Sequence, residues 1–194
     1  CQAILQHPNA IAFGANARIA HNKEIQKKLS FLTNLPFKSI QSPQALLNTY
    51  FGRHQTGIAP YPSYLYKKSA LGSLAFSSLG GKYSDVIWLL QLVKKKPIIW
   101  VNQPLLIYNL HGGNDGLQES LKDRLKFLGF LKQNPSFTSK RLTSDYRFFI
   151  YKKALTSKKV LMQPQRMKKI KTFMLVYRVG RVFRLQEYLG MFKK

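Results

Sequence analysis

The stretch that decides the fold covers residues 80–114 and reads GGKYSDVIWLLQLVKKKPIIWVNQPLLIYNLHGGN. After the two glycines, apolar residues recur at three- and four-residue spacing through 84–94, which predicts an amphipathic helix. Two short apolar runs follow, at 97–101 and 105–110, and we expect each to form a strand. A lone acid, a helix, two short strands and a His-Gly-Gly loop thus fall within 35 residues.

One carboxylate in this stretch is isolated. Asp85 is the only acidic residue between Glu24 and Asp115. It can be a helix-start residue, with Ser84 as the N-cap and Asp85 in the first turn, where the helix dipole favours negative charge. It can also be a carboxylate at the mouth of a cleft that accepts a proton. Spacing alone favours the helix-start interpretation, and the two roles are compatible.

The order of short motifs adds a resemblance. The segments YSDVIWLL at 83–90 and PLLIYNLH at 104–111 resemble the C-terminal half of family 2 glycosyltransferases. The resemblance covers roughly residues 1–130. It implies the C-terminal part of a GT-A fold, a Rossmann-like α/β domain, in which a sugar passes from a nucleotide-sugar (UDP-linked or similar) to an acceptor hydroxyl with inversion. The acceptor would be a cell-surface glycan or a lipid-linked saccharide.

The resemblance also assigns residue roles. It implies that Asp85 is the catalytic base and that His111 is a ligand of a divalent ion, Mn²⁺ or Mg²⁺, that neutralises the leaving nucleoside diphosphate. It places Pro62, Ser63 and Tyr64 beside the acceptor. Tyr108 and Asn114 become candidates for contact with the donor diphosphate, although Asn109 stands where the family usually has arginine after that tyrosine. Asn114, with the glycines before it, also fits an ordinary turn.

The family's nucleotide-binding first half, with its Asp-x-Asp metal motif, is not found in this sequence. We therefore expect the chain to be the C-terminal portion of a longer enzyme and to be inactive alone. The expected organisation is a catalytic and acceptor-binding part at 1–135, followed by a basic helical extension at 136–194.

Charge suggests a second partner. The formal net charge is +25, and residues 140–194 hold 16 of the 32 Lys and Arg against two acids. Lysines and arginines alternate with aromatics there, which suits an anionic membrane surface and predicts a cytoplasmic enzyme bound peripherally to the inner face of the membrane. A helical extension packed on the catalytic part explains the same pattern. The alternative function is a non-catalytic basic module that binds nucleic acid or membrane, although no motif for reading nucleic acid is visible.

The remaining segments give simpler predictions. Residues 2–6 read as a helix end, 10–21 as a core strand, 22–40 as a loop with a short helix, and 58–66 as an irregular edge segment. Ser42 before Pro43 predicts a helix start, and Ser69 predicts a cap for a helix to residue 76. Further helices are expected at 117–131, where Asn134 and Pro135 end the helix, and at 143–157 and 164–189. Trp88 and Trp100 are expected in the core.

Overall fold

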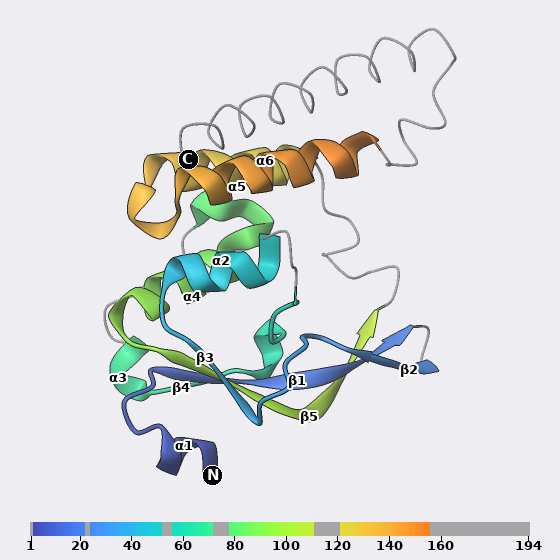
Figure 1. The fold of residues 1–194 in the computed structure, drawn as a ribbon, viewed down its shortest axis with the longest axis vertical. Coiled ribbons are helices and arrows are strands. Elements are labelled where there is room, and N and C mark those ends of the chain that lie inside the picture. The colour runs from blue at the N-terminus through green and yellow to red at the C-terminus, as the bar shows by residue number, and fades with distance from the viewer. Residues whose placement is uncertain (1, 22–23, 52–55, 72–77, 111–120, 156–194) are drawn as a thin grey trace, which may run out of the picture.

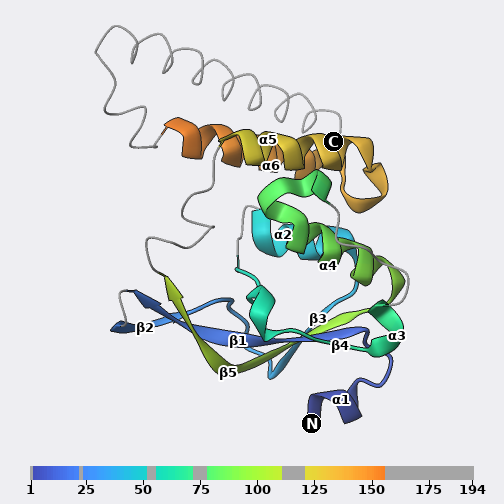
Figure 2. The same cartoon turned by 180° about the vertical axis from the view of Figure 1, so that it is seen from behind.

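The computed structural model describes residues 2–21, 24–51, 56–71, 78–110 and 121–155, and these form an α/β structure in layers (Figure 1). A curled sheet carries α2 and α4 on one face and the short α1 on the other. α5 and α6 lie side by side over α2 and α4, on the side away from the sheet (Figures 1 and 2). The elements in chain order are α1 (Gln2–Gln6), β1 (Ala12–His21), β2 (Glu24–Leu29), β3 (Phe37–Ile40), α2 (Pro43–Phe51), the 3₁₀ turn η1 (Tyr61–Ser63), β4 (Leu65–Tyr66), α3 (Lys68–Leu71), the 3₁₀ segment η2 (Ser78–Tyr83), α4 (Ser84–Lys95), β5 (Ile98–Leu110), α5 (Leu121–Gln133), the 3₁₀ turn η3 (Pro135–Phe137) and α6 (Lys140–Leu155).

The sheet is mixed, with the order β2-β1-β5-β3 and with β4 also paired to β1. β1 and β5 are parallel, and the other pairs are antiparallel. The prediction of a loop and a short helix over 22–40 is wrong, because this segment supplies β2 and β3. Both are formed through pairing, β2 with β1 and β3 with β5, and such partners are not visible in a local pattern.

The two short strands expected at 97–101 and 105–110 are one strand, β5. Its register against β1 slips, because Ala15 pairs with Val101 whereas the next residue, Asn16, pairs with Pro104. Asn102 and Gln103 are therefore extra residues on β5. A bulge of this kind lets the strand continue past a proline, which cannot donate a ladder hydrogen bond.

A buried amide network fills this bulge. Asn16 is 0 % exposed, and its Nδ2 donates to the Phe31 carbonyl at 3.0 Å and to Asn102 Oδ1 at 3.1 Å. Its Oδ1 accepts from Ser30 Oγ at 2.8 Å and from the Ala17 N–H at 2.9 Å. Asn102 in turn donates to the Thr33 carbonyl. One side chain of β1 thus ties the segment between β2 and β3 to the centre of the sheet.

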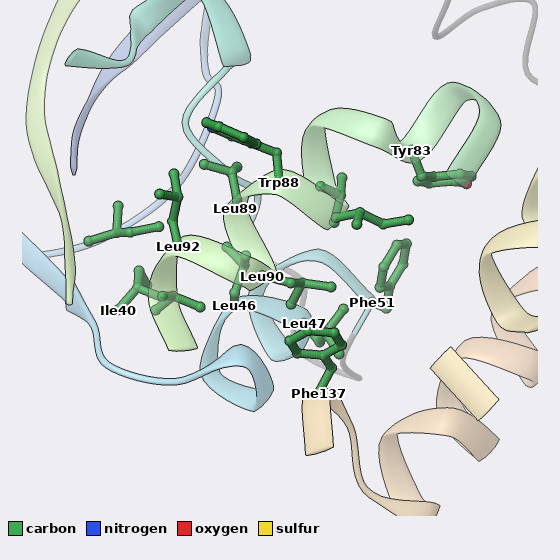
Figure 3. Close-up of a cluster of buried hydrophobic side chains, with 14 of the residues drawn as sticks. Ile40, Leu46, Leu47, Phe51, Tyr83, Trp88, Leu89, Leu90, Leu92 and Phe137 are labelled. Atoms are coloured by element: carbon green, nitrogen blue, oxygen red, sulfur yellow. The ribbon is translucent and has the colours of Figure 1, made fainter. Parts of the chain in front are cut away.

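The core lies between the sheet and the helices. In Figure 3 the side chains of α2 and α4 meet in a continuous apolar cluster, which Ile40 of β3 and Phe137 of η3 also join. Trp100 is 0 % and Trp88 4 % exposed, which confirms both as core residues. α2 begins as expected, because Ser42 Oγ accepts the Ala45 N–H at 3.1 Å.

The first part of the predicted basic extension packs on this core. Tyr146 of α6 is 1 % exposed, and its ring centroid lies 4.1 Å from that of Phe51 in α2. It also contacts Phe127 of α5, at 5.6 Å. Residues 136–155 are therefore part of the folded body, and the expected helix at 164–189 lies outside the described residues. Within the described ranges, no helix combines the length and apolarity needed to cross a membrane.

Candidate active site

Asp85 lies in the first turn of α4, as the helix-start interpretation predicted. The expected N-cap, however, is wrong. Tyr83 occupies the cap position, and Ser84 is the first helical residue, with its hydroxyl donating to the Gly81 carbonyl at 2.7 Å. Gly81 has φ of 57°, so the chain turns from η2 into α4 through a conformation that favours glycine. The Ser84 hydroxyl closes that turn, and no serine side chain caps the helix.

The Asp85 carboxylate accepts a free N–H of the helix end. Its Oδ1 lies 2.8 Å from the Val86 nitrogen. Burial nevertheless raises the pKa of Asp85 above its ordinary value of 3.8, against the lowering by this backbone hydrogen bond. Desolvation therefore has the larger effect, and the carboxylate is a stronger base than a solvated aspartate. That is the adjustment a general base needs, provided it stays ionised at the working pH.

The charge of this carboxylate acts on two tyrosines of the segment that contains η1 and β4. Burial raises the pKa of the Tyr61 and Tyr66 phenols, and the charge of Asp85 adds to both rises. The two rings have centroids 6.5 Å apart, and the Tyr66 ring packs edge-on against Trp88, one turn after Asp85 on α4. Tyr61 is only partly buried. Tyr61, Tyr66 and Trp88 thus form an aromatic wall, and its two tyrosines are within reach of the Asp85 charge.

The three predicted acceptor residues have different surroundings. Pro62 is exposed in η1. The Ser63 hydroxyl donates to the Pro60 carbonyl at 2.7 Å and accepts the Ala15 N–H of β1 at 3.1 Å, so it completes backbone hydrogen bonding. Tyr64 is 8 % exposed, and its oxygen accepts from Trp100 Nε1 at 2.7 Å. Its ring also lies against β1, where a Cβ on Gly14 would come within 2.9 Å of it.

Sequence reasoning missed Tyr61 and Tyr66. Both belong to the PYPSYLY run at 60–66, in which Pro60, Tyr61 and Tyr66 surround the predicted acceptor residues. The high density of aromatic residues in this run was the signal that could have pointed to them. The pattern could not show that Tyr64 turns into the core while Tyr61 stays partly exposed, because an irregular segment has no fixed side-chain period.

The predicted donor side of the site is only partly described. Tyr108 is half-buried on β5, next to Ile19 of β1. β5 ends at Leu110 beside His21, and His111 and Asn114 lie outside the described residues. In the part of the chain that the structure describes, no three His, Cys, Asp or Glu side chains come together as a metal site.

Comparisons with protein-family models, with curated proteins and with solved structures gave no match.

The raised pKa of Asp85 gives a stability prediction. Because the folded state holds the Asp85 proton more tightly than the unfolded chain, ionisation of Asp85 destabilises the fold as the pH rises through 3.8 and then through the raised folded pKa. Asp85→Asn is expected to leave the thermal midpoint unchanged near pH 3 and to raise it at pH 7. Thermal unfolding of both proteins from pH 3 to pH 8 measures this. A variant less stable than the parent at pH 7 would mean that the carboxylate mainly stabilises the helix start.

Proposed function

We propose that this chain is the acceptor-binding and catalytic part of an inverting glycosyltransferase that resembles family 2 enzymes of the GT-A fold. The observation that carries the proposal is the packing of the Tyr61–Tyr66 segment against α4. The Tyr66 ring lies edge-on to Trp88 with centroids 6.3 Å apart, and the charge of Asp85 adds to the raised pKa of Tyr61 and Tyr66. The resemblance placed the base and the acceptor contacts in these two segments, about 20 residues apart, and in the folded chain they are neighbours. The mixed sheet with its covering helices is compatible with the broader α/β class to which the GT-A fold belongs.

The proposed chemistry follows from the position of the carboxylate. Asp85 takes the proton of an acceptor hydroxyl while the hydroxyl oxygen attacks the anomeric carbon of the donor sugar, and the bond from that carbon to the nucleoside diphosphate breaks. The raised pKa strengthens the base, and the partly exposed Tyr61 places an aromatic ring at the acceptor side.

The metal role of His111 rests on the resemblance alone. In the ranges that the structure describes, there is no ligand set around which a divalent ion could be placed, and His111 lies outside them. The proposal therefore includes Mn²⁺ or Mg²⁺ as an expected cofactor of the whole enzyme but routes no step through it. The placement at the inner face of a membrane likewise rests on the basic composition of residues 140–194.

The test uses protein expressed from the complete reading frame, with nucleotide-sugar donors, a lipid-linked acceptor in vesicles with or without anionic lipid, and Mn²⁺ or Mg²⁺. Asp85→Asn is expected to lower the transfer rate about 10²–10⁴-fold, the usual contribution of a general base. Glu24→Gln is the matched control, since Glu24 is exposed on β2, and it is expected to keep full activity. Transfer and sedimentation with the vesicles should both rise with anionic lipid.

Transfer that persists in Asp85→Asn would exclude Asp85 as the base. Absence of transfer, together with salt-sensitive binding of nucleic acid or vesicles that Asp85→Asn leaves unchanged, would favour the non-catalytic basic module instead.

A further inference from the structure

A second candidate site includes Tyr83, the residue that precedes α4. A cavity of about 430 Å³ opens between the end of β2, the end of α2 and α6. This volume is in the range of small-molecule sites. Asp85 is not among the residues that line the cavity, so this site does not use the proposed base.

Aromatic rings from three parts of the chain form the walls. Tyr50 and Phe51 end α2, Tyr83 precedes α4, and Phe149 comes from α6. Their rings contact one another, with centroids 6.3 Å apart for Tyr50 and Tyr83 and 6.4 Å apart for Phe51 and Phe149. Phe51 and Tyr83 are each only 4 % exposed, so the partly exposed Tyr50 and Phe149 present the ring surface that suits a sugar or a base.

The floor of the cavity is held rigidly. Gly57 has φ of 83° and pairs with Phe31 in an isolated bridge. Ser30, beside it, is fixed by its hydrogen bonds to Asn16 and to the Ala17 carbonyl. The cavity is therefore bounded by backbone that is fixed from the centre of the sheet, and a preformed site of this kind loses little free energy to ordering when it binds a ligand.

The charge of the cavity is positive. Among its described lining residues, Lys28 alone is charged. Lys38 is not a lining residue, but its Nζ donates to the hydroxyl of Thr56, which is one, at 2.8 Å. Two ammonium groups without a lining carboxylate favour a dianion over a single carboxylate.

We propose that this cavity binds a small ring compound that carries a phosphate group. The ring packs against the aromatic walls, and the phosphate lies at the rim near Lys28, with Lys38 adding positive potential through the Thr56 side. A sugar phosphate and a nucleoside monophosphate both have this chemistry. The probes are therefore glucose 1-phosphate for the first source and UMP for the second.

Binding is measured by saturation-transfer difference NMR titration of each probe. At least one probe is expected to bind saturably, with its ring protons receiving most of the transfer, and the probe that binds identifies the source. Lys28→Glu is expected to weaken binding about 10–100-fold, the usual loss for a charged hydrogen bond. Tyr50→Leu is expected to reduce ring-proton transfer severalfold, and circular dichroism confirms that each variant is folded.

Lys27→Glu is the matched control. Lys27 is the preceding residue on β2, exposed and not part of the cavity, and side chains of consecutive strand residues point to opposite faces. It makes the same charge change and is expected to leave binding unchanged. If Lys28→Glu and Lys27→Glu weaken probe binding equally, the probes are attracted by the overall positive charge of the protein and not by the cavity. If neither probe saturates below about 10 mM, which corresponds to a binding free energy of only about 3 kcal/mol, the cavity is a packing gap that binds no ligand. Either result overturns the proposal. Asp85→Asn is expected to bind the probes as the parent does. A negative binding result therefore contradicts only the cavity proposal, and a negative transfer result contradicts only the proposed function.

Discussion

Replacing Asn16 by leucine is expected to lower the free energy of unfolding by about 4–6 kcal/mol, most of the stability of an ordinary domain. Leucine has nearly the same shape but cannot hydrogen-bond. The Phe31 carbonyl and Asn102 would lose a donor, and the hydroxyl of Ser30 would lose its acceptor. Each buried polar group left unsatisfied costs about 1–3 kcal/mol, and the Asn16 side chain itself is 0 % exposed.

Urea unfolding followed by tryptophan fluorescence measures this loss, because Trp100 packs against Phe31 with ring centroids 5.1 Å apart. Asn48→Leu is the matched control, since Asn48 is exposed on α2, and its effect is expected to stay within about 0.5 kcal/mol. Asn102→Leu, at a half-buried residue that shares the network, should fall between the two. An Asn16→Leu protein destabilised by less than about 1 kcal/mol would mean that the network contributes little.

The second large effect is expected for Gly57→Ala, which should cost more than about 3 kcal/mol or prevent folding. The residue has φ of 83°, where a side chain is strained, and the new Cβ would lie 2.1 Å from the Ser30 carbonyl oxygen. Neither the oxygen nor its backbone can move easily, because Ser30 and Phe31 are held by Asn16. The substitution should also close or distort the cavity at its floor.

Gly129→Ala adds the same methyl group at a different glycine and is the comparison for Gly57→Ala. Gly129 is inside α5, and nothing lies within 4 Å of the position its Cβ would take. Alanine there is expected to stabilise the protein by up to about 1 kcal/mol, because glycine is the poorer helix former. Chemical denaturation of the two variants side by side measures both effects. Equal stability of Gly57→Ala and the parent would contradict the rigid floor.

Asp85 shows how stability and the proposed activity oppose each other. Its raised pKa means that the folded protein accommodates the charged carboxylate poorly, so Asp85→Asn should make the fold more stable at neutral pH while it removes the proposed base. A residue kept only to start a helix would give the reverse result. The two Asp85 measurements are therefore informative together.

Local patterns in the sequence determined the helices and the central strand. The periodicity of 84–94 predicted α4, Ser42 and Pro43 predicted the start of α2, and the apolar small residues of 10–21 predicted β1. Asn134 and Pro135 marked the end of α5. These signals are visible because helix spacing, caps and proline act within a few residues of one another. The isolation of Asp85 and its place in the first turn were readable for the same reason.

Only the tertiary structure decided the rest, because partners distant in the sequence decide it. β2 and β3 exist because β1 and β5 accept their hydrogen bonds, and β5 continues past Pro104 because β1 tolerates a bulge there. The same holds within the candidate site, where Tyr64 is drawn into the core by Trp100 and Gly14, while Tyr61 remains beside Asp85. The sequence alone determined which residue types could carry chemistry. The folded chain determined which of these residues come together, because contact across more than 20 residues depends on packing that no local pattern encodes.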